Sequence, residues 1–473
     1  MKKQIINNHI EFYKWFKEPV SVYALDTETT SLNYLDLELL GISLCDGKKA
    51  CYIPYNNDMD LILDDLDAWL KFSTVVMHNA VFDLKVLRKY GVYPHDIFCT
   101  LTGAKLIDEN LPAHSLKFLA LDWLGVPIKE VKKWDEVAHD TNSEQFANYA
   151  MNDAIWTHKL YQFEKKAFKE ENLEYIADIE MDFQRVLVEL EINGVSVDNK
   201  KLEVFKHECN KILIDIESSM LGIFGKDHII QRDLFGEQIL LSPINFGSSQ
   251  QLVDCVNRLG FTADKTKKGN PSIGKDYLIR MKGEHEFFNL LWRYRKLQKL
   301  YSSFLEPLPE FIDSDGRIRP SYQMVRTGRL ACSKPNLQQL PNPKKEKLEF
   351  NHREVFIPEK GNVLIKADYS GQELRVLGEV ANDNNILDAF NRDYDLHLFT
   401  ANRVFDLGLD EQAFVDGSVP HTEACEKYKQ KRHQAKNGVN FPIVYGATPG
   451  RIAKDNKVAV KEAERWLEQF FEL

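Results

Sequence analysis

The segment SVYALDTETTSL, residues 21–32, ends an apolar run with two carboxylates that lie two residues apart. Its apolar pattern predicts a β-strand, so the side chains of Asp26 and Glu28 project to the same face of that strand. Two like charges at this separation are unfavourable unless a cation lies between them. The segment therefore indicates either a solvated strand end or one part of a metal site.

Strand-like and helix-like patterns alternate on the C-terminal side of this segment. Residues 37–55 contain two apolar runs separated by an Asp-Gly turn, and residues 63–72 have helical periodicity. Residues 141–173 carry one long amphipathic helical pattern. This alternation predicts a single α/β domain over residues 1–178.

The rest of the sequence is mainly helical in pattern. Helical periodicity dominates residues 179–305, and a stretch rich in proline, asparagine and lysine follows at residues 334–347. The apolar run at residues 363–368 predicts a strand that ends in Asp368, with helices beyond it. The expected domains are residues 1–178, 179–345 and 346–473.

Composition limits the classes of function. The net charge of -10 argues against a protein that coats nucleic acid over its whole surface, although local basic patches remain possible. None of the seven cysteines forms a CxxC pair, which favours reduced thiols over a zinc site. The N-terminus lacks the apolar core of a signal peptide, so we expect a cytoplasmic protein.

Two further motifs accompany the acidic strand. HNAVFDLKVL supplies Asn79 and Asp83, and YAMNDAIW supplies Tyr149 and Asp153. The members of each pair are four residues apart, which predicts that they share a helix face. Together with the acidic strand, this ordered set resembles the DEDDy family of 3′→5′ exonucleases.

The resemblance implies roles for these residues. Asp26, Glu28 and Asp153 would hold one metal ion, Asp26 would bridge to a second, and Asp83 would act through water. Tyr149 would orient the attacking water, and Asn79 would contact the DNA. All-oxygen ligands suit Mg²⁺ or Mn²⁺, and the resemblance implies two ions per active site. Such metals lower the pKa of bound water. The implied reaction releases a 3′-terminal nucleotide as its 5′-monophosphate.

Three motifs in the C-terminal half widen the resemblance. RTGRLACSKPNLQQLPNP, KADYSGQELR and KRHQAKNGVNFPIVYG are similar to segments of family A DNA polymerases. That family implies an α/β RNase H-like exonuclease domain followed by a right-hand polymerase domain, here with a thumb, part of a palm, and fingers. Primer-template DNA and deoxynucleoside triphosphates would be the partners.

The family also implies residues for a polymerase site. The Asp368 side chain and the Tyr369 carbonyl would bind metal, and Glu373 would close off the 2′ side of the incoming sugar. Three residues would contact the minor groove of the primer-template: Arg329, Asn336 and Gln338. Five would meet the incoming nucleotide or the templating base: His397, Arg432, Lys436, Phe441 and Tyr445.

The fingers motif departs from the family pattern. The step from Lys436 to Phe441 is five residues, where family members usually have four, and Pro442 follows. A proline inside a helix removes one backbone hydrogen bond, and an inserted residue can be absorbed by a π-bulge. We therefore predict a bulge or kink near residues 437–442, without which Lys436 would turn away from the phosphate face.

The printed sequence contains no His-Asp-Glu, the motif that carries the second palm aspartate in this family. One carboxylate cannot bracket two metal ions about 4 Å apart. We therefore expect that this chain does not polymerise DNA by itself and that a second polypeptide supplies the rest of the palm. The last helix is expected to expose an apolar stripe that includes Trp466, Phe470 and Phe471.

Two alternatives to a split polymerase remain open at this point. The chain could be a DNA-binding 3′→5′ exonuclease without polymerase activity, or a primer-template scaffold without catalysis. Primer extension and 3′ degradation by the chain distinguish these readings from one another.

Overall fold

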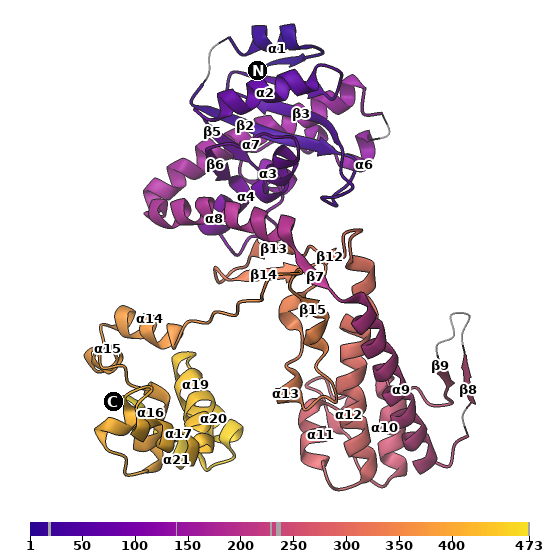
Figure 1. Cartoon of the computed structure of the whole chain (residues 1–473), viewed down its shortest axis with the longest axis vertical. Coiled ribbons are helices and arrows are strands. Elements are labelled where there is room, and N and C mark those ends of the chain that lie inside the picture. Colours follow the sequence, from indigo (N-terminus) through magenta and orange to yellow (C-terminus); the bar gives the residue numbers. More distant parts are fainter. Residues whose placement is uncertain (18–19, 139, 228, 233–237, 472–473) are drawn as a thin grey trace. The chain divides into compact units, whose positions relative to one another are not determined.

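The computed structural model describes residues 1–17, 20–138, 140–227, 229–232 and 238–471. The chain divides into two compact units, Met1–Leu364 and Ile365–Leu473. Figure 1 shows a mixed sheet covered by helices and then a largely helical segment in the first unit, and helices in the second.

The first unit contains a six-stranded sheet with the strand order β1-β4-β3-β2-β5-β6. Its strands are β1 (Lys2–Ile5), β2 (Val22–Thr29), β3 (Leu39–Cys45), β4 (Lys49–Pro54), β5 (Thr74–Met77) and β6 (Asp96–Cys99). Strand β2 is antiparallel to β3 and parallel to β5, which places it inside the sheet. The acidic strand of the sequence is therefore paired on both sides.

Helices cover this sheet and complete the first hydrophobic core. They are α1 (His9–Trp15), α2 (Met59–Leu70), α3 (Ala80–Lys89), α4 (Thr100–Ile107), α5 (Leu116–Asp122), α6 (Trp134–Val137), α7 (Glu144–Glu171) and α8 (Glu174–Asn193). Helix α7 packs on β2 and β3. The α/β organisation expected for this part is present, and buried side chains of α8 extend the same core to Val188, beyond the division expected at residue 178.

A second core lies in the helical segment that follows. Helix α9 (Asn199–Ile223) packs along α12 (Glu286–Leu300), and Phe287 and Phe288 are fully buried between the surrounding helices. The other helices here are α10 (Ser249–Arg258), α11 (Lys275–Met281) and α13 (Pro343–Glu346). The strands are β7 (Val195–Val197), β8 (Ile229–Arg232), β9 (Gln238–Leu241), β10 (Asp264–Lys265), β11 (Pro271–Ser272), β12 (Arg317–Ile318), β13 (Ser321–Met324), β14 (Leu330–Ser333) and β15 (Phe356–Ile357).

The described part of the second unit contains helices joined by short loops. They are α14 (Gln372–Ala381), α15 (Asn384–Asn391), α16 (Leu396–Phe405), α17 (Val419–Lys427), α18 (Lys429–Gln434), α19 (Phe441–Val444), α20 (Pro449–Asn456) and α21 (Val460–Phe471). A π-helical turn, Ala435–Asn440, links α18 to α19. Helices α16, α20 and α21 pack around this turn.

The bulge expected near residues 437–442 is confirmed. The π-helical turn absorbs the additional residue between Lys436 and Phe441, and Pro442 occupies the first turn of α19. The Phe441 N–H still donates to the Lys436 carbonyl across the π-helical turn, and Pro442, which has no N–H, makes no such bond. The spacing and Pro442 thus predicted the place of a bulge or kink, and the structure shows that it is a π-helical turn.

The prediction of a strand at residues 363–368 is wrong. These residues have no regular secondary structure, and Ile365 is 88% exposed. Asp368, which we expected at the end of a buried strand, is exposed as well. An apolar run becomes a strand only when a neighbouring strand takes up its backbone N–H and C=O groups, and no described strand pairs with this run.

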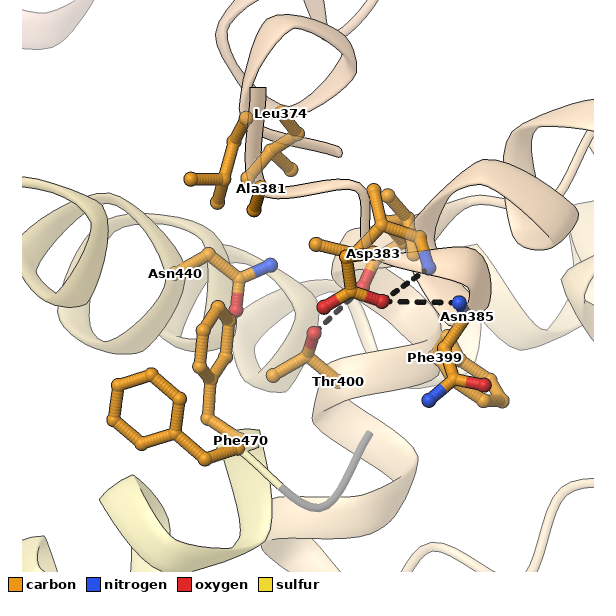
Figure 2. Close-up of a pocket in the computed structure, with 12 residues that line it drawn as sticks. Leu374, Ala381, Asp383, Asn385, Phe399, Thr400, Asn440 and Phe470 are labelled. Carbon is orange, nitrogen blue, oxygen red and sulfur yellow. Dashed lines mark hydrogen bonds between the residues drawn. The ribbon is translucent and has the colours of Figure 1, made fainter. Parts of the chain in front are cut away.

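The exposed stripe expected on the last helix is only partly present. Trp466 is 1% exposed and packs edge-on against Phe405, with ring centroids 5.3 Å apart. Phe471 is 74% exposed, and Phe470 borders an apolar pocket between α14, α15, α16 and α21 (Figure 2). The indole is buried because α21 folds back onto α16, which helical periodicity alone does not reveal.

This difference predicts unequal stability effects along α21. The change Trp466→Ala should lower the free energy of unfolding of the second unit by about 3–5 kcal/mol, because it opens a cavity in a buried cluster. The control Phe471→Ala should change it by about 0.5 kcal/mol or less, since that ring is mainly exposed. Urea unfolding followed by far-UV circular dichroism compares the two; equal effects would contradict the observed burial.

Candidate active site

Four acidic side chains from three elements gather beside β2, an inner strand of the first unit's sheet. Asp26 and Glu28 lie on β2, Asp83 lies in the first turn of α3, and Asp153 lies on α7. Carboxylate oxygens of Asp26, Glu28 and Asp153 all lie within 4.8 Å of one another. The two-residue spacing on β2 and the packing of α7 on that strand bring these groups together.

Asp83 is held by the backbone of the same strand. Its Oδ1 accepts a hydrogen bond from the Thr27 N–H at 2.9 Å and another from the Thr27 hydroxyl at 2.7 Å. Asn79 departs from expectation, because it precedes α3 in a left-handed conformation with φ of 72°. The four-residue spacing predicted a shared helix face for Asn79 and Asp83, but Asn79 lies before the first residue of the helix and does not share that face.

Burial and mutual repulsion favour the neutral forms of these acids. Burial and the neighbouring Glu28 raise the pKa of Asp26 well above its usual value. Burial, followed by the charge of Asp153, raises the pKa of Glu28 to about 8. Burial also raises the pKa of Asp83 to about 7, against the opposing hydrogen bonds from Thr27.

The cluster meets the requirements of a divalent-cation site. Glu28 Oε1 is buried and has no hydrogen-bond partner among the described residues. A buried carboxylate oxygen without a donor is costly, and a cation can satisfy it. The donor atoms here are all oxygens, the set that Mg²⁺ and Mn²⁺ prefer.

Two more side chains complete the surroundings of the acids. Tyr149 lies one turn before Asp153 on α7, and burial and the nearby carboxylates raise the pKa of its phenol, so the hydroxyl keeps its proton. Lys117 on α5 forms an ion pair with Asp153 Oδ1, and its ammonium lies 4.2 Å from the centre of the Tyr149 ring. Our sequence analysis missed Lys117, because a single lysine in a short apolar helix carries no motif.

A second group of residues meets in the second unit. Five of the expected polymerase residues line one pocket: Asp368, Tyr369, His397, Arg432 and Lys436. Lys436 lies in the π-helical turn and lines the same pocket as Arg432 on α18. Lys436 Nζ lies 5.6 Å from the centre of the Phe441 ring, which is 5.7 Å from the His397 ring. The Tyr445 hydroxyl donates to Glu373 Oε1 at 2.7 Å.

Asp395 organises this pocket and was also missed by the sequence analysis. Its Oδ1 accepts the backbone N–H groups of His397 and Leu398 at the start of α16. Its Oδ2 lies 2.5 Å from Arg432 Nε and 3.1 Å from His421 Nε2. Burial alone would raise the pKa of Asp395, but these partners hold it below its usual value. Burial and the charge of Lys436 lower the pKa of His397 to about 4, so its imidazole is neutral.

The three expected minor-groove residues lie in the first unit. Arg329 is in the turn between β13 and β14, and Asn336 and Gln338 follow β14. Gln338 Oε1 accepts the Cys332 N–H at 3.1 Å, whereas Asn336 Oδ1 is buried and has no partner among the described residues. Gln338 is therefore engaged in holding its own loop.

Comparisons with known proteins match both parts of the chain. The family model "DNA polymerase family A" matches residues 232–473, and the model "3'-5' exonuclease" matches residues 3–167. The fold and the two groups of residues define a polymerase-type protein with an exonuclease domain. The chain belongs to DNA polymerase family A.

The curated relatives are bacterial DNA polymerases I. The one from Pseudomonas aeruginosa is 29% identical, over 99% of this chain and 51% of its own length. The one from Borreliella burgdorferi is 28% identical, over 95% of this chain and 47% of its own length. The one from Bacillus caldotenax is 31% identical, over 95% of this chain and 49% of its own length. The chain thus spans about half the length of these relatives.

One solved structure shares the fold over nearly the whole chain. It is the POL domain of Pol1 from M. smegmatis in complex with DNA primer-template and dNTP, with a TM-score of 0.77 and 21% identity. The match covers 99% of this chain and 76% of that one. No helix in the described part of the chain combines the length and apolarity of a membrane span.

The raised pKa values predict that the metal-free protein loses stability as pH rises. A carboxyl whose pKa is higher folded than unfolded binds more protons in the native state, so its contribution is present at low pH and is lost on deprotonation. For Glu28 and Asp83 the loss extends from their ordinary values of 4.5 and 3.8 up to about 8 and about 7.

The measurement is thermal unfolding in EDTA between pH 5.5 and pH 8.5. The midpoint should fall across this range, and Mn²⁺ should restore it at the upper end, because the ion binds the deprotonated acids. Glu28→Gln should flatten the pH dependence. A midpoint that rises with pH in EDTA would contradict the assignment.

Proposed function

We propose that the chain is a metal-dependent 3′→5′ DNA exonuclease that acts on single-stranded 3′ ends. The observation that carries this proposal is the meeting of Asp26, Glu28 and Asp153 within 4.8 Å, next to a protonated Tyr149. The single ammonium of Lys117 offsets only part of the charge of these three carboxylates, so a fold that keeps them together implies a further cationic ligand.

The residues of the site have distinct tasks in this reaction. Asp26, Glu28 and Asp153 would hold the divalent ions, with Asp83 acting through water, and the ions would lower the pKa of water and neutralise phosphate charge. Tyr149 can donate its hydroxyl proton in a hydrogen bond and so orient the attacking water. Thr27 fixes Asp83 through two hydrogen bonds, which keeps that carboxylate aimed at the cluster.

The change Asp26→Ala should abolish degradation, because it removes the carboxylate shared by the expected metal ions. The rate of release of 3′-terminal nucleotides from a labelled single strand should fall by about two orders of magnitude or more. DNA affinity in EDTA, measured by fluorescence anisotropy, should change little. The control Asp64→Ala alters an exposed acid on α2 and should leave the rate unchanged. Undiminished degradation by Asp26→Ala would refute the proposal.

We also propose that the pocket in the second unit binds the triphosphate of a deoxynucleotide. Three cationic side chains line it, Arg375, Arg432 and Lys436. The neutral His397 lines it as well and can donate a hydrogen bond to phosphate. Phe441 is near enough to these residues to stack on a bound sugar. Arg329, Asn336 and Gln338 would contact the primer-template.

Template-directed synthesis would need one more carboxylate. Asp368 is the family's first palm aspartate by its motif, and the printed sequence has no His-Asp-Glu to supply the second. We propose that a palm segment outside residues 1–473 supplies it and completes the metal site. The family membership and the three cations on the pocket support a part in synthesis over an exonuclease with no such part.

Primer extension tests this second proposal. The chain alone, with Mg²⁺ and the four deoxynucleoside triphosphates, should not extend a labelled primer, because one carboxylate cannot hold both metal ions. Addition of a palm fragment with His-Asp-Glu should produce extension, and Arg432→Ala should reduce it. Asp26→Ala in every reaction prevents degradation of the primer. Extension by residues 1–473 without this fragment would refute the need for the additional carboxylate.

A further inference from the structure

Lys117 places a positive charge inside the acidic cluster of the first unit. Its ammonium pairs with Asp153 Oδ1, on a carboxylate that is itself within 4.8 Å of Asp26 and Glu28. The Lys117 side chain is 25% exposed and that of Asp153 is 8% exposed, so solvent screens this pair only weakly. Lys117 is therefore the counter-charge that this structure offers to Asp153.

Two aromatic rings hold the ammonium in this position. Lys117 Nζ lies 4.2 Å from the centre of the Tyr149 ring and 5.0 Å from that of Trp156, and both rings belong to α7. An ammonium within about 6 Å of a ring centre is attracted by the electrons of the ring face. The contacts with Asp153 and with the two rings therefore favour one placement of a side chain that is otherwise flexible.

This placement conflicts with the expected role of Asp153. The ammonium occupies one of the two oxygens of Asp153, and its positive charge repels a divalent cation that approaches the other. Asp26 and Glu28, the other members of the cluster, are also affected, because the charge of Lys117 opposes the rise of their pKa values. One monovalent charge partly balances an excess of negative charge that divalent ions would balance more fully.

We propose that Lys117 is an internal counter-ion of the metal-free site, which leaves Asp153 when a divalent cation binds. This inference rests on the proposed exonuclease function. The ammonium stabilises the gathered carboxylates while no metal is bound, and it competes with the metal for Asp153. Lys117 thereby lowers the affinity of the site for metal. Once released from Asp153, its ammonium can form an ion pair with a phosphate of bound DNA.

The variant Lys117→Met separates charge from packing, because methionine keeps an unbranched apolar side chain and removes the ammonium. Its affinity for Mn²⁺, measured by electron paramagnetic resonance of the free ion, should increase about tenfold. Its unfolding midpoint in EDTA should fall below that of the wild type, and Mn²⁺ should remove the difference. Lys159→Met is the matched control, since Lys159 is an exposed residue of α7, and it should behave as wild type in both measurements.

A double variant guards against simple loss of the fold. Lys117→Met combined with Asp153→Asn removes both charges of the pair, so its midpoint in EDTA should recover relative to Lys117→Met alone. Its Mn²⁺ affinity should be lower than that of the wild type, because a metal ligand is lost. Failure of the midpoint to recover would mean that Lys117 acts through packing, and that outcome would overturn the inference.

The Mn²⁺ titrations distinguish failure of this inference from failure of the proposed function. If the wild type binds Mn²⁺ and degrades DNA while Lys117→Met has unchanged or weaker affinity, the counter-ion role is refuted and the nuclease stands. If the wild type neither binds Mn²⁺ nor degrades DNA, the proposed function is refuted, and the counter-ion role with it.

Discussion

Helix α7 packs on strands β2 and β3, and the site of the first unit depends on that contact. The helix brings Asp153 and Tyr149 to the side of β2 that carries Asp26 and Glu28. Hydrophobic burial along α7 provides the free energy that holds like charges together, since the carboxylates repel one another. The same helix supplies the two rings beside Lys117. The packing of α7 on the sheet therefore determines both where the carboxylates meet and where the Lys117 ammonium lies.

The second unit uses a single buried carboxylate for a comparable purpose. Asp395 starts α16 by accepting two backbone N–H groups, and it also fixes the Arg432 guanidinium. His397 and Arg432 therefore depend on one side chain for their placement on the pocket. The π-helical turn after α18 keeps Lys436 on that pocket despite the additional residue in the sequence. An insertion that would otherwise rotate a helix face is thus confined to one turn.

Several features of this molecule could be predicted from local sequence. The α/β organisation of the first unit, the long helix that carries Tyr149 and Asp153, and the irregular turn before Pro442 follow from periodicity and backbone chemistry. The common face of Asp26 and Glu28 follows from the two-residue period of a strand. Asn79 was misplaced because the start of α3 depends on a left-handed residue, which spacing does not reveal.

The sequence by itself determined which residues can carry the chemistry, because side-chain type and spacing along one element are local properties. Only the tertiary structure decided which charges meet. Lys117 and Asp395 belong to no spacing motif, and their partners lie on other helices. Trp466 is buried and residues 363–368 are exposed for the same reason. An apolar residue is buried, and an apolar run is paired, only when another part of the fold covers it.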